Sequence, residues 1–386
     1  MLTPIYQDPM ATLYQGHVLD LLAQLPEESV NCVVTSPPYW GLRKYAGEQD
    51  RLWDNHNRCE HEWGDELCHR ESKEDSASGI AGTPRAGCGF SASGGQSCLK
   101  CGAWRGAYGL EPTIALYIQH SIEVLKAIKR VLRPGGVVFW NIADSYNGSG
   151  KKEVQINSPK QMTNGGAIEQ RENNDTTLKP KDLCLIPERM AIAAQDAGWW
   201  VRSMIVWSKP NPMPESVTDR PTDAYENIIM LTKSARYWYD GEAVKEAAID
   251  WGERDRTNGK YKVEGLANGL TGKQANHENR TYAGFNQRWG TTKPSPTRNL
   301  RNVWEIPTQP YKEAHFATFP EKIPERCILA SCPQDGVVLE PFAGSGTTLA
   351  VAKRLGRKSI GIELSEQYCQ LAIKRIQAVT LPMVTA

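Results

Sequence analysis

The first stretch that could do chemistry is Ser36-Pro-Pro-Tyr39, which follows the apolar run Ser29–Val34. Prolines lack an N–H donor and have a fixed φ, so the carbonyls of Pro37 and Pro38 are held rigidly. A hydroxyl and a proline carbonyl could accept both hydrogens of an exocyclic amino group, whose lone pair is otherwise delocalised into its ring. Ser36, Pro37, Pro38 and Tyr39 are therefore candidate catalytic residues, with Tyr39 stacking on an extruded base. A purely structural Pro-Pro turn is the alternative.

A second candidate site is the glycine-rich turn Phe342–Thr348, near the end of the sequence. Gly344 and Gly346 permit a tight turn and close approach of a ligand to the backbone. The strand predicted after it ends at Glu363, an acid suited to holding two ribose hydroxyls. A third fingerprint glycine and a Gly-Lys-Ser/Thr sequence are absent, which disfavours phosphate binding. An uncharged-tailed nucleoside such as S-adenosylmethionine is preferred, and an ordinary strand-to-helix turn is the alternative.

These motifs need elements that position them. The order strand, glycine turn, helix, strand, acid is typical of half a doubly wound nucleotide fold. Apolar, β-branched runs predict buried strands of a parallel sheet, and amphipathic runs predict helices. The predicted strands are 29–34, 137–142, 200–207, 227–231, 337–339 and 359–362, and the predicted helices are 18–25, 112–131, 186–198, 323–330 and 349–355 with one more at the end.

Taken together, the two motifs resemble the β-class amino-methyltransferases of DNA, in which Ser/Asp-Pro-Pro-Tyr precedes the cofactor motif. The resemblance covers most of the chain. It implies an α/β, Rossmann-like S-adenosylmethionine-dependent methyltransferase fold, with a mostly parallel sheet, helices on both faces and a circularly permuted motif order. Further matching blocks are Lys181–Leu183, Gly198–Arg202, Trp207–Pro212, Asp219–Glu226 and His315–Glu321.

The resemblance also implies roles for individual residues. Ser36, Pro37 and Tyr39 match the catalytic motif, and Glu340 stands where the family usually has Asp. His17 stands where many members have an Asp that contacts adenine, so its role is left open. A serine motif is more often linked to cytosine N4 than to adenine N6, so cytosine is favoured and adenine is the alternative. The implied cofactor-binding residues are Phe319, Pro320, Glu340, Phe342, Gly344, Ser345, Gly346, Thr347 and Glu363.

A Cys/His-rich stretch predicts a structural zinc site. Cys59 and His61 form one close pair and Cys98 and Cys101 another, with a Gly/Ser-rich segment between them. Cys-x-x-Cys is the chelating spacing of zinc knuckles. This segment has few apolar side chains, so a bound metal would supply the free energy that stabilises its fold. Unliganded surface thiols are the alternative. Other residues that could replace a ligand are Cys68, His69 and Cys88.

Composition divides the chain into five parts: a methyltransferase core in three pieces, 1–49, 111–251 and 303–386, a Cys/His-rich insertion, 50–110, and a target-recognition region, 252–302. Residues 146–181 have few large apolar side chains and are predicted to be a mobile loop. The stretch 252–302 is basic and carries aromatic residues, which suits contact with double-stranded DNA, although such a run is often only a solvated face. Its candidate DNA-binding residues are Arg254, Arg256, Lys273, Arg280, Arg288 and Arg298.

The formal net charge of the 386-residue chain is only +1, so any attraction to DNA must come from local patches. A secretory signal and a membrane-length apolar run are absent, which favours a cytoplasmic protein of a bacterium, archaeon or phage. A homodimer and a cognate restriction endonuclease are compatible partners. Rival interpretations are methylation of RNA or a protein glutamine, and a non-catalytic zinc-containing DNA-binding protein on a methylase fold.

Overall fold

The computed structural model describes residues 2–41, 50–54, 59–65, 68–69, 91–92, 95–148, 175, 177–248, 297–309 and 319–380. The chain divides into two compact units, one of residues 1–240 with 301–386 and one of residues 241–300. In the second unit, strand β12 (Glu246–Ala247) pairs with strand β13 (Thr297–Arg298). Among the described residues, no helix is both long and apolar enough to cross a membrane.

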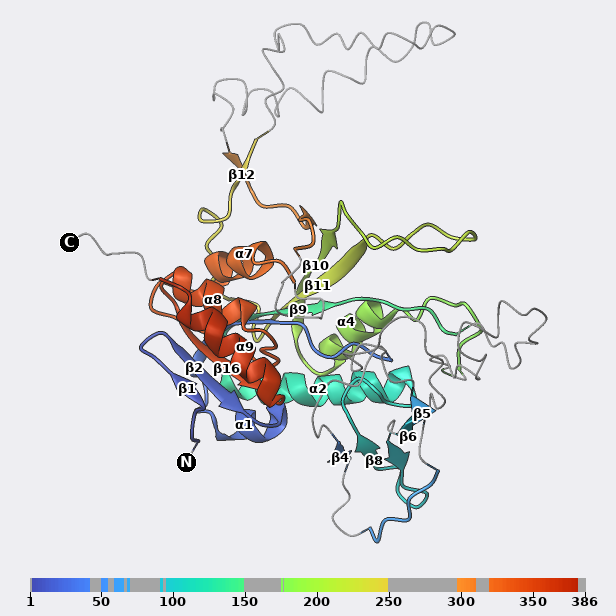
Figure 1. The fold of residues 1–386 in the computed structure, drawn as a ribbon. Helices are drawn as coiled ribbons and strands as arrows, with labels where there is room; N and C mark the ends of the chain where they lie inside the picture. Colours follow the sequence, from blue (N-terminus) through green and yellow to red (C-terminus); the bar gives the residue numbers. More distant parts are fainter. Residues whose placement is uncertain are drawn as a thin grey trace, which may run out of the picture. The chain divides into compact units, whose positions relative to one another are not determined.

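A nine-stranded sheet organises the first unit (Figure 1). Its five central strands, from β2 to β9, run parallel, whereas β1, β11 and β10 each pair antiparallel with a neighbour. Val33, Val138 and Leu339 are fully buried on these central strands, as a parallel sheet covered on both faces requires. The strand order is β1 (Tyr6–Gln7), β2 (Ala11–Gln15), β16 (Lys358–Glu363), β15 (Val337–Glu340), β3 (Val30–Thr35), β9 (Leu132–Ile142), β11 (Tyr225–Thr232), β10 (Trp200–Ser208) and β14 (Val303–Glu305).

Within the described residues, six helices pack on the sheet in two groups, one on each face (Figure 1). One group is α1 (Val18–Gln24), α2 (Ile114–Val131) and α4 (Ile186–Asp196), and the other is α7 (Lys322–Ser331), α8 (Thr347–Arg354) and α9 (Glu366–Gln377). Each predicted helix and strand is present with ends shifted by a few residues. The predicted mostly parallel α/β architecture is therefore confirmed. Strands β1, β2 and β14 were not predicted, because such short segments carry little hydrophobic pattern.

The described part of the Cys/His-rich insertion packs within the first unit. It forms a three-stranded antiparallel sheet of β4 (Arg51–Trp53), β8 (Trp104–Gly106) and β7 (Gln96–Ser97), and β5 (Cys68–His69) pairs with β6 (Ser91–Ala92). Trp53 and Trp104 are almost completely buried, so the insertion adds to the hydrophobic core.

The predicted mobile loop 146–181 is described only at its two ends. Asn147 joins these ends, because its side chain donates to the carbonyls of Asp175, Leu178 and Lys179 at 3.0–3.2 Å. Its backbone N–H donates to the carbonyl of Asp182 at 2.8 Å. Residues 149–174 and 176, where the mobility was predicted, lie outside the described residues.

Candidate active site and metal centre

The two motifs from opposite ends of the sequence meet at one edge of the sheet. Strand β3 leads into Ser36 and strand β15 leads into the turn at Phe342. The two strands are parallel neighbours, with Leu339 paired to Val33. Both motifs therefore leave the sheet from adjacent carboxyl ends, which is where open α/β folds bind ligands.

The catalytic motif belongs to a compact hydrogen-bond network. The Ser36 hydroxyl donates to the Tyr39 hydroxyl at 3.0 Å, and Tyr39 donates to Glu226 Oε2 at 2.6 Å. Asn141 Nδ2 donates to both the Tyr39 and Glu226 oxygens at 2.8 Å. Lys209 Nζ lies 2.5 Å from Glu226 Oε1 and balances its charge. Five side chains, Ser36 among them, thus form one network from three separate regions of the sequence.

Three members of this network, Asn141, Lys209 and Glu226, were not assigned to the site from the sequence. Asn141 lies near the end of β9, Glu226 near the start of β11, and Lys209 directly after β10. Because β11 runs antiparallel to β9, its beginning lies at the same edge as the end of β9. Two signals were available: a polar residue beside the end of an apolar strand, and, for Lys209 and Glu226, a place within the blocks that match the family.

The proline carbonyls of the motif differ in their contacts. Tyr117 donates its hydroxyl proton to the carbonyl of Pro38 at 2.9 Å. Within the described part of the chain, no hydrogen bond reaches the carbonyl of Pro37. The next residue, Trp40, is buried, and its indole N–H donates to the carbonyl of Glu111 at 2.9 Å. The turn is thus fixed by Pro38 and Trp40, whereas the Pro37 carbonyl keeps its lone pairs.

The glycine turn after β15 is closed by Glu363 at the end of β16. The backbone N–H of Gly344 donates to Glu363 Oε2 at 2.7 Å, and that of Ser365 to Glu363 Oε1 at 2.9 Å. Gly344 and Gly346 have φ of 50° and 78°, which favour glycine. A Cβ on Gly346 would lie 2.9 Å from Ala372, whereas one on Gly344 would meet only the Phe342 carbonyl at 4.0 Å. The lack of a side chain at Gly346 therefore lets the start of α8 pack against α9. The lack of a side chain at Gly344 leaves open space beside the turn.

Glu340, predicted as a cofactor contact, holds the turn from beneath. Its side chain is buried, and its two oxygens accept from the Phe342 N–H at 3.2 Å and the Thr348 hydroxyl at 2.8 Å. Burial raises the pKa of Glu340 to about 8. Both oxygens are thus engaged by the turn itself, so the geometry favours a bracing role over a ligand contact.

Arg375 on α9 ties the remaining predicted cofactor residues together. Its Nη1 donates to the hydroxyls of Ser345 and Thr347 at 3.3 and 2.7 Å. Its Nη2 donates to Glu321 at 2.9 Å, and Glu321 directly follows Phe319 and Pro320 in the sequence. The glycine turn and the Phe319–Pro320 segment are therefore held by one guanidinium.

The sequence matches the N6/N4 DNA methylase family over residues 30–374. The chain belongs to this DNA methylase family. It is similar to the type II methyltransferase M.Cfr9I of Citrobacter freundii, with 34% identity across 95% of this chain and 88% of that protein. It is also similar to the type II methyltransferase M.SmaI of Serratia marcescens, with 32% identity across 94% and 89%.

The fold of this methylase is also that of a solved DNA methyltransferase. The cytosine-N4-specific PvuII enzyme superposes with a TM-score of 0.50 and 17% identity, covering 99% of this chain and 90% of that one. The family and the fold implied by the sequence motifs are therefore confirmed. The methylase is a type II DNA methyltransferase of the N4/N6 family.

His17 of the methylase lies between β2 and α1, near the end of β16. The preceding Gly16 donates its N–H to the Glu363 carbonyl at 2.9 Å. His17 caps α1 by accepting the Leu19 N–H at 3.3 Å, and Arg51 Nη1 lies 3.0 Å from the same ring nitrogen. Burial, with Arg51 nearby, lowers the pKa of His17 to about 4. This residue is thus a neutral helix cap, one residue after the contact with Glu363, and an adenine contact stays a prediction.

The four predicted metal ligands of the methylase lie together. One ligand atom from each of Cys59, His61, Cys98 and Cys101 lies within 4.8 Å of the others. The Cys59 and Cys98 sulfurs are 3.9 Å apart, and Cys101 Sγ lies 3.5 Å from His61 Nδ1. With Zn–S bonds of about 2.3 Å, a tetrahedral site needs sulfurs roughly 3.8 Å apart. The side chains of the alternates Cys68, His69 and Cys88 lie outside the described residues.

Of the candidate DNA-binding residues, only Arg298 is described. It lies on β13 in the second unit, where its Nε is 3.3 Å from Glu246 Oε2 on β12. The other five, Arg254, Arg256, Lys273, Arg280 and Arg288, lie outside the described residues. Their contact with DNA stays a prediction.

Proposed function

We propose that the methylase transfers a methyl group from S-adenosylmethionine to the exocyclic amino group of a base flipped out of double-stranded DNA. The adjacency of β3 and β15 carries this proposal, because it brings the Ser36 motif and the Gly344 turn to one edge of the sheet. At this edge, the Ser36 motif offers hydrogen-bond acceptors for an amine, and the Gly344 turn offers a binding site for a nucleoside. Methyl transfer between two such ligands requires mainly positioning and electrostatic support.

The residues of the glycine turn fit an adenosyl group. Each oxygen of Glu363 accepts one backbone N–H and keeps a lone pair for a ribose hydroxyl. The Phe342 ring, 5.8 Å from the Tyr108 ring, adds an apolar aromatic surface. Bound S-adenosylmethionine supplies an electrophilic methyl group on a sulfonium. Glu363 would hold the ribose, while Phe319 and Pro320 would wall the methionine end.

The Ser36 network would orient the target amine and take up its proton. Because Ser36 donates to Tyr39, its oxygen lone pairs can accept an amine hydrogen, and the Pro37 carbonyl can accept the other. Asn141 is 3% exposed, and its Oδ1 has no hydrogen-bond partner among the described residues. A buried orphan acceptor of this kind suits a donor brought by a substrate.

Formation of the new N–C bond obliges the amine to lose one proton. The hydrogen bonds from Ser36 to Tyr39 and from Tyr39 to Glu226 run in one direction. A proton passed to the serine oxygen would release the serine proton to Tyr39 and the tyrosine proton to Glu226 Oε2. Glu226 is therefore the proposed proton acceptor.

Cytosine N4 is the favoured target, and adenine N6 is the alternative. The preference rests on the serine at the head of the motif, since Ser-Pro-Pro-Tyr resembles the cytosine-directed members. The serine hydroxyl could accept from either amino group.

A structural zinc ion is the second ligand that we propose. Cys59, His61, Cys98 and Cys101 offer three thiolates and one imidazole at tetrahedral spacing. Such a site has no open position for a substrate, so we assign zinc the role of folding the insertion.

The DNA partner would be contacted by the basic region 252–302. The proposed contacts are Arg254, Arg256, Lys273, Arg280, Arg288 and Arg298. The similarity to type II methyltransferases supports a cognate restriction endonuclease as a further partner, whereas a homodimer and a cytoplasmic location stay predictions.

The proposal is tested by incubating the protein with unmethylated plasmid DNA and S-adenosylmethionine. Digestion of the DNA to nucleosides followed by mass spectrometry should reveal N4-methylcytosine. N6-methyladenine would shift the target to the alternative base. DNA binding without any methylated nucleoside would favour the non-catalytic zinc-containing protein instead.

A further inference from the structure

The segment that leads out of the Cys/His-rich insertion lies directly beneath the catalytic motif. The carbonyl of Gly109 accepts the Gly41 N–H at 2.7 Å. Gly109 has a φ of 95°, and a Cβ there would lie 3.1 Å from both Pro38 Cβ and the Tyr39 carbonyl. The Trp40 indole bonds to the carbonyl of Glu111, two residues further on. The position of residues 109–111 therefore sets the position of the catalytic turn.

Residues 109–111 are in turn held by an acid–imidazole–acid chain, in which Glu111 and His120 are buried and Asp54 is partly exposed. Glu111 Oε2 accepts the Gly109 N–H at 2.9 Å, and Glu111 Oε1 lies 2.9 Å from His120 Nδ1. His120 has no exposed surface, and its Nε2 lies 3.1 Å from Asp54 Oδ2. Burial alone would lower the pKa of His120, but its bonds with Glu111 and Asp54 outweigh that effect and raise it. Each ring nitrogen of His120 is thus engaged by a carboxyl group.

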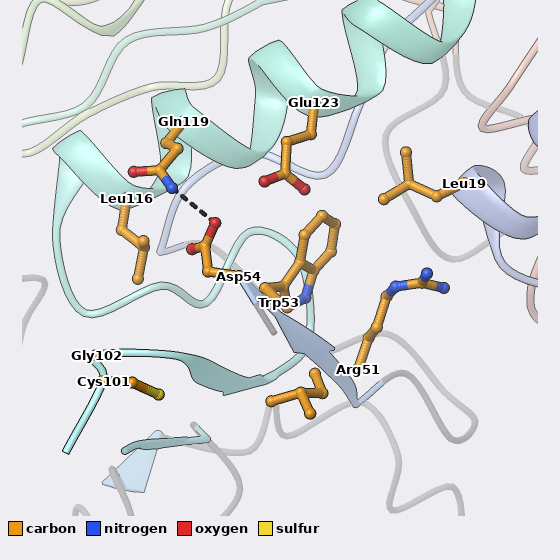
Figure 2. Close-up of a pocket in the computed structure, with 10 residues that line it drawn as sticks. Leu19, Arg51, Trp53, Asp54, Cys101, Gly102, Leu116, Gln119 and Glu123 are labelled. Carbon is orange, nitrogen blue, oxygen red and sulfur yellow. Dashed lines mark hydrogen bonds between the residues drawn. The ribbon is translucent and has the colours of Figure 1, made fainter. Parts of the chain in front are cut away.

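The far end of this chain belongs to the insertion. Asp54 directly follows β4, and it also accepts the Gln119 Nε2 proton at 2.7 Å (Figure 2). The His120 ring stacks on Trp53 of β4 at 4.4 Å, with Trp104 of β8 at 5.7 Å. Strands β4 and β8 pair with each other, Trp53 opposite Trp104. Trp53 and Trp104 of the insertion therefore hold the His120 ring by stacking. Asp54 holds it by a hydrogen bond at Nε2.

Figure 2 shows the surface cavity beside this junction, with a volume of about 620 Å³. Asp54, Gln119 and Glu123 line it, and Glu123 also faces Asp54 and His120. None of the proposed catalytic or cofactor residues is among the residues that line this cavity.

We propose that His120 is a positioning residue, which transmits the folded state of the Cys/His-rich insertion to the catalytic turn through Asp54 on one side and Glu111 on the other. The insertion then acts as a scaffold for Ser36–Tyr39. This inference rests on the proposed function only in taking that turn as catalytic. Small errors in the placement of reacting groups cost about 100-fold in rate, so loosening the turn should slow methyl transfer.

The experiment compares four variants of the full chain: Asp54→Ala, Glu111→Ala, Glu111→Gln and Ser331→Ala. Glu111→Gln keeps an oxygen that can accept the Gly109 N–H. Ser331→Ala is the control, because it removes a buried hydroxyl that bonds to the Cys327 carbonyl and to Cys32 Sγ and lies outside the insertion. Hydrogen exchange by mass spectrometry is read in peptides covering 36–41 and 339–348. Single-turnover methylation at saturating DNA and the Kd for S-adenosylmethionine are measured alongside.

We expect Asp54→Ala and Glu111→Ala to speed exchange at 36–41 but not at 339–348. Their single-turnover rates should fall by about 10- to 100-fold, with a Kd for S-adenosylmethionine within about threefold of wild type because Glu340, Glu363 and Arg375 hold that site. Glu111→Gln should recover part of the loss, and Ser331→Ala should match wild type in rate.

Two results would overturn the inference. One is a folded Glu111→Ala protein with unchanged exchange at 36–41. The other is an Asp54→Ala protein that loosens only peptides of the insertion, since the hydrogen bonds of Asp54 within the described residues go to Gln119 and His120 and not to the turn. Exchange needs no activity, so a wild-type protein that fails to methylate DNA would refute the proposed function while the exchange measurement still decides this inference.

Discussion

The hydroxyl of Tyr39 lies 2.6 Å from Glu226 Oε2, although 187 residues separate the two in the sequence. This contact links the turn after β3 to the beginning of β11 and connects Ser36 to a carboxylate that Lys209 neutralises. A serine that only positioned an amine would not need hydrogen bonds that could carry the amine's proton to a carboxylate.

Replacing Glu226 by Gln should therefore slow the chemical step. The amide keeps the size of the side chain but cannot take a proton, and loss of an acid–base group costs about 100-fold or more in rate. Single-turnover methylation should fall while binding of S-adenosylmethionine is retained. Exposed Glu188→Gln on α4 is the control, and equal rates for the two variants would exclude the proposed proton route.

Replacing Ser36 by Ala should nearly abolish methylation. Removing one preorganised hydrogen-bonding group from an active site costs about 100- to 1,000-fold in turnover. Transfer of a tritiated methyl group to DNA measures the loss, and the Kd for S-adenosylmethionine should remain unchanged because Ser36 belongs to the neighbouring turn. A Ser36→Ala protein as active as wild type would remove Ser36 from the site.

Glu340 should make the methylase less stable as the pH rises. An exposed glutamate in the unfolded chain has a pKa of about 4.3, whereas burial raises that of Glu340 to about 8. The folded state therefore binds the Glu340 proton more tightly than the unfolded chain does. The stabilisation from this proton is complete at pH values below the unfolded pKa of about 4.3, and it is lost as the pH rises towards 8. A tenfold difference in proton affinity corresponds to about 1.4 kcal/mol, so the loss should reach several kcal/mol.

Urea unfolding of wild type and Glu340→Gln at pH 6 and pH 8.5 checks this expectation. The amide mimics the protonated acid, so the variant should gain stability relative to wild type at the higher pH. A difference between the two proteins that is the same at both pH values would show that Glu340 does not titrate in this range.

Purified methylase should contain about one zinc ion per chain, as a four-ligand structural site would hold it. Mass spectrometry of the metal content should show that Cys101→Ser loses the ion, while Cys369→Ala, at a buried cysteine remote in sequence from the cluster, retains it. Fully folded wild-type protein without metal would contradict the zinc assignment.

The local motifs were predictable because each depends on neighbours in the sequence. Gly344, Gly346 and Glu363 follow the strand–turn–helix–strand pattern, and that pattern also places the acid at the end of β16. The ligand pairs at Cys59 and Cys98 were visible from spacing alone.

Asn141, Lys209 and Glu226 could not be found in the same way. Their approach to Ser36 depends on the strand order β3-β9-β11-β10 and on the antiparallel direction of β11. Periodicity identifies such strands but does not say which edge of the sheet their ends reach. Arg375 was missed for a related reason, since it bonds to Ser345 and Thr347 from a helix beyond the next strand.

The bonds from Arg375 to the glycine turn have a consequence for protein synthesis. The ribosome delivers Ser36 early, but the guanidinium that fastens Ser345 and Thr347 is added only when α9 is made. A nascent chain still short of α9 would already carry its serine motif while the turn lacked this support. We therefore expect a chain that ends before α9 to hold the glycine turn less firmly than the longer chain does.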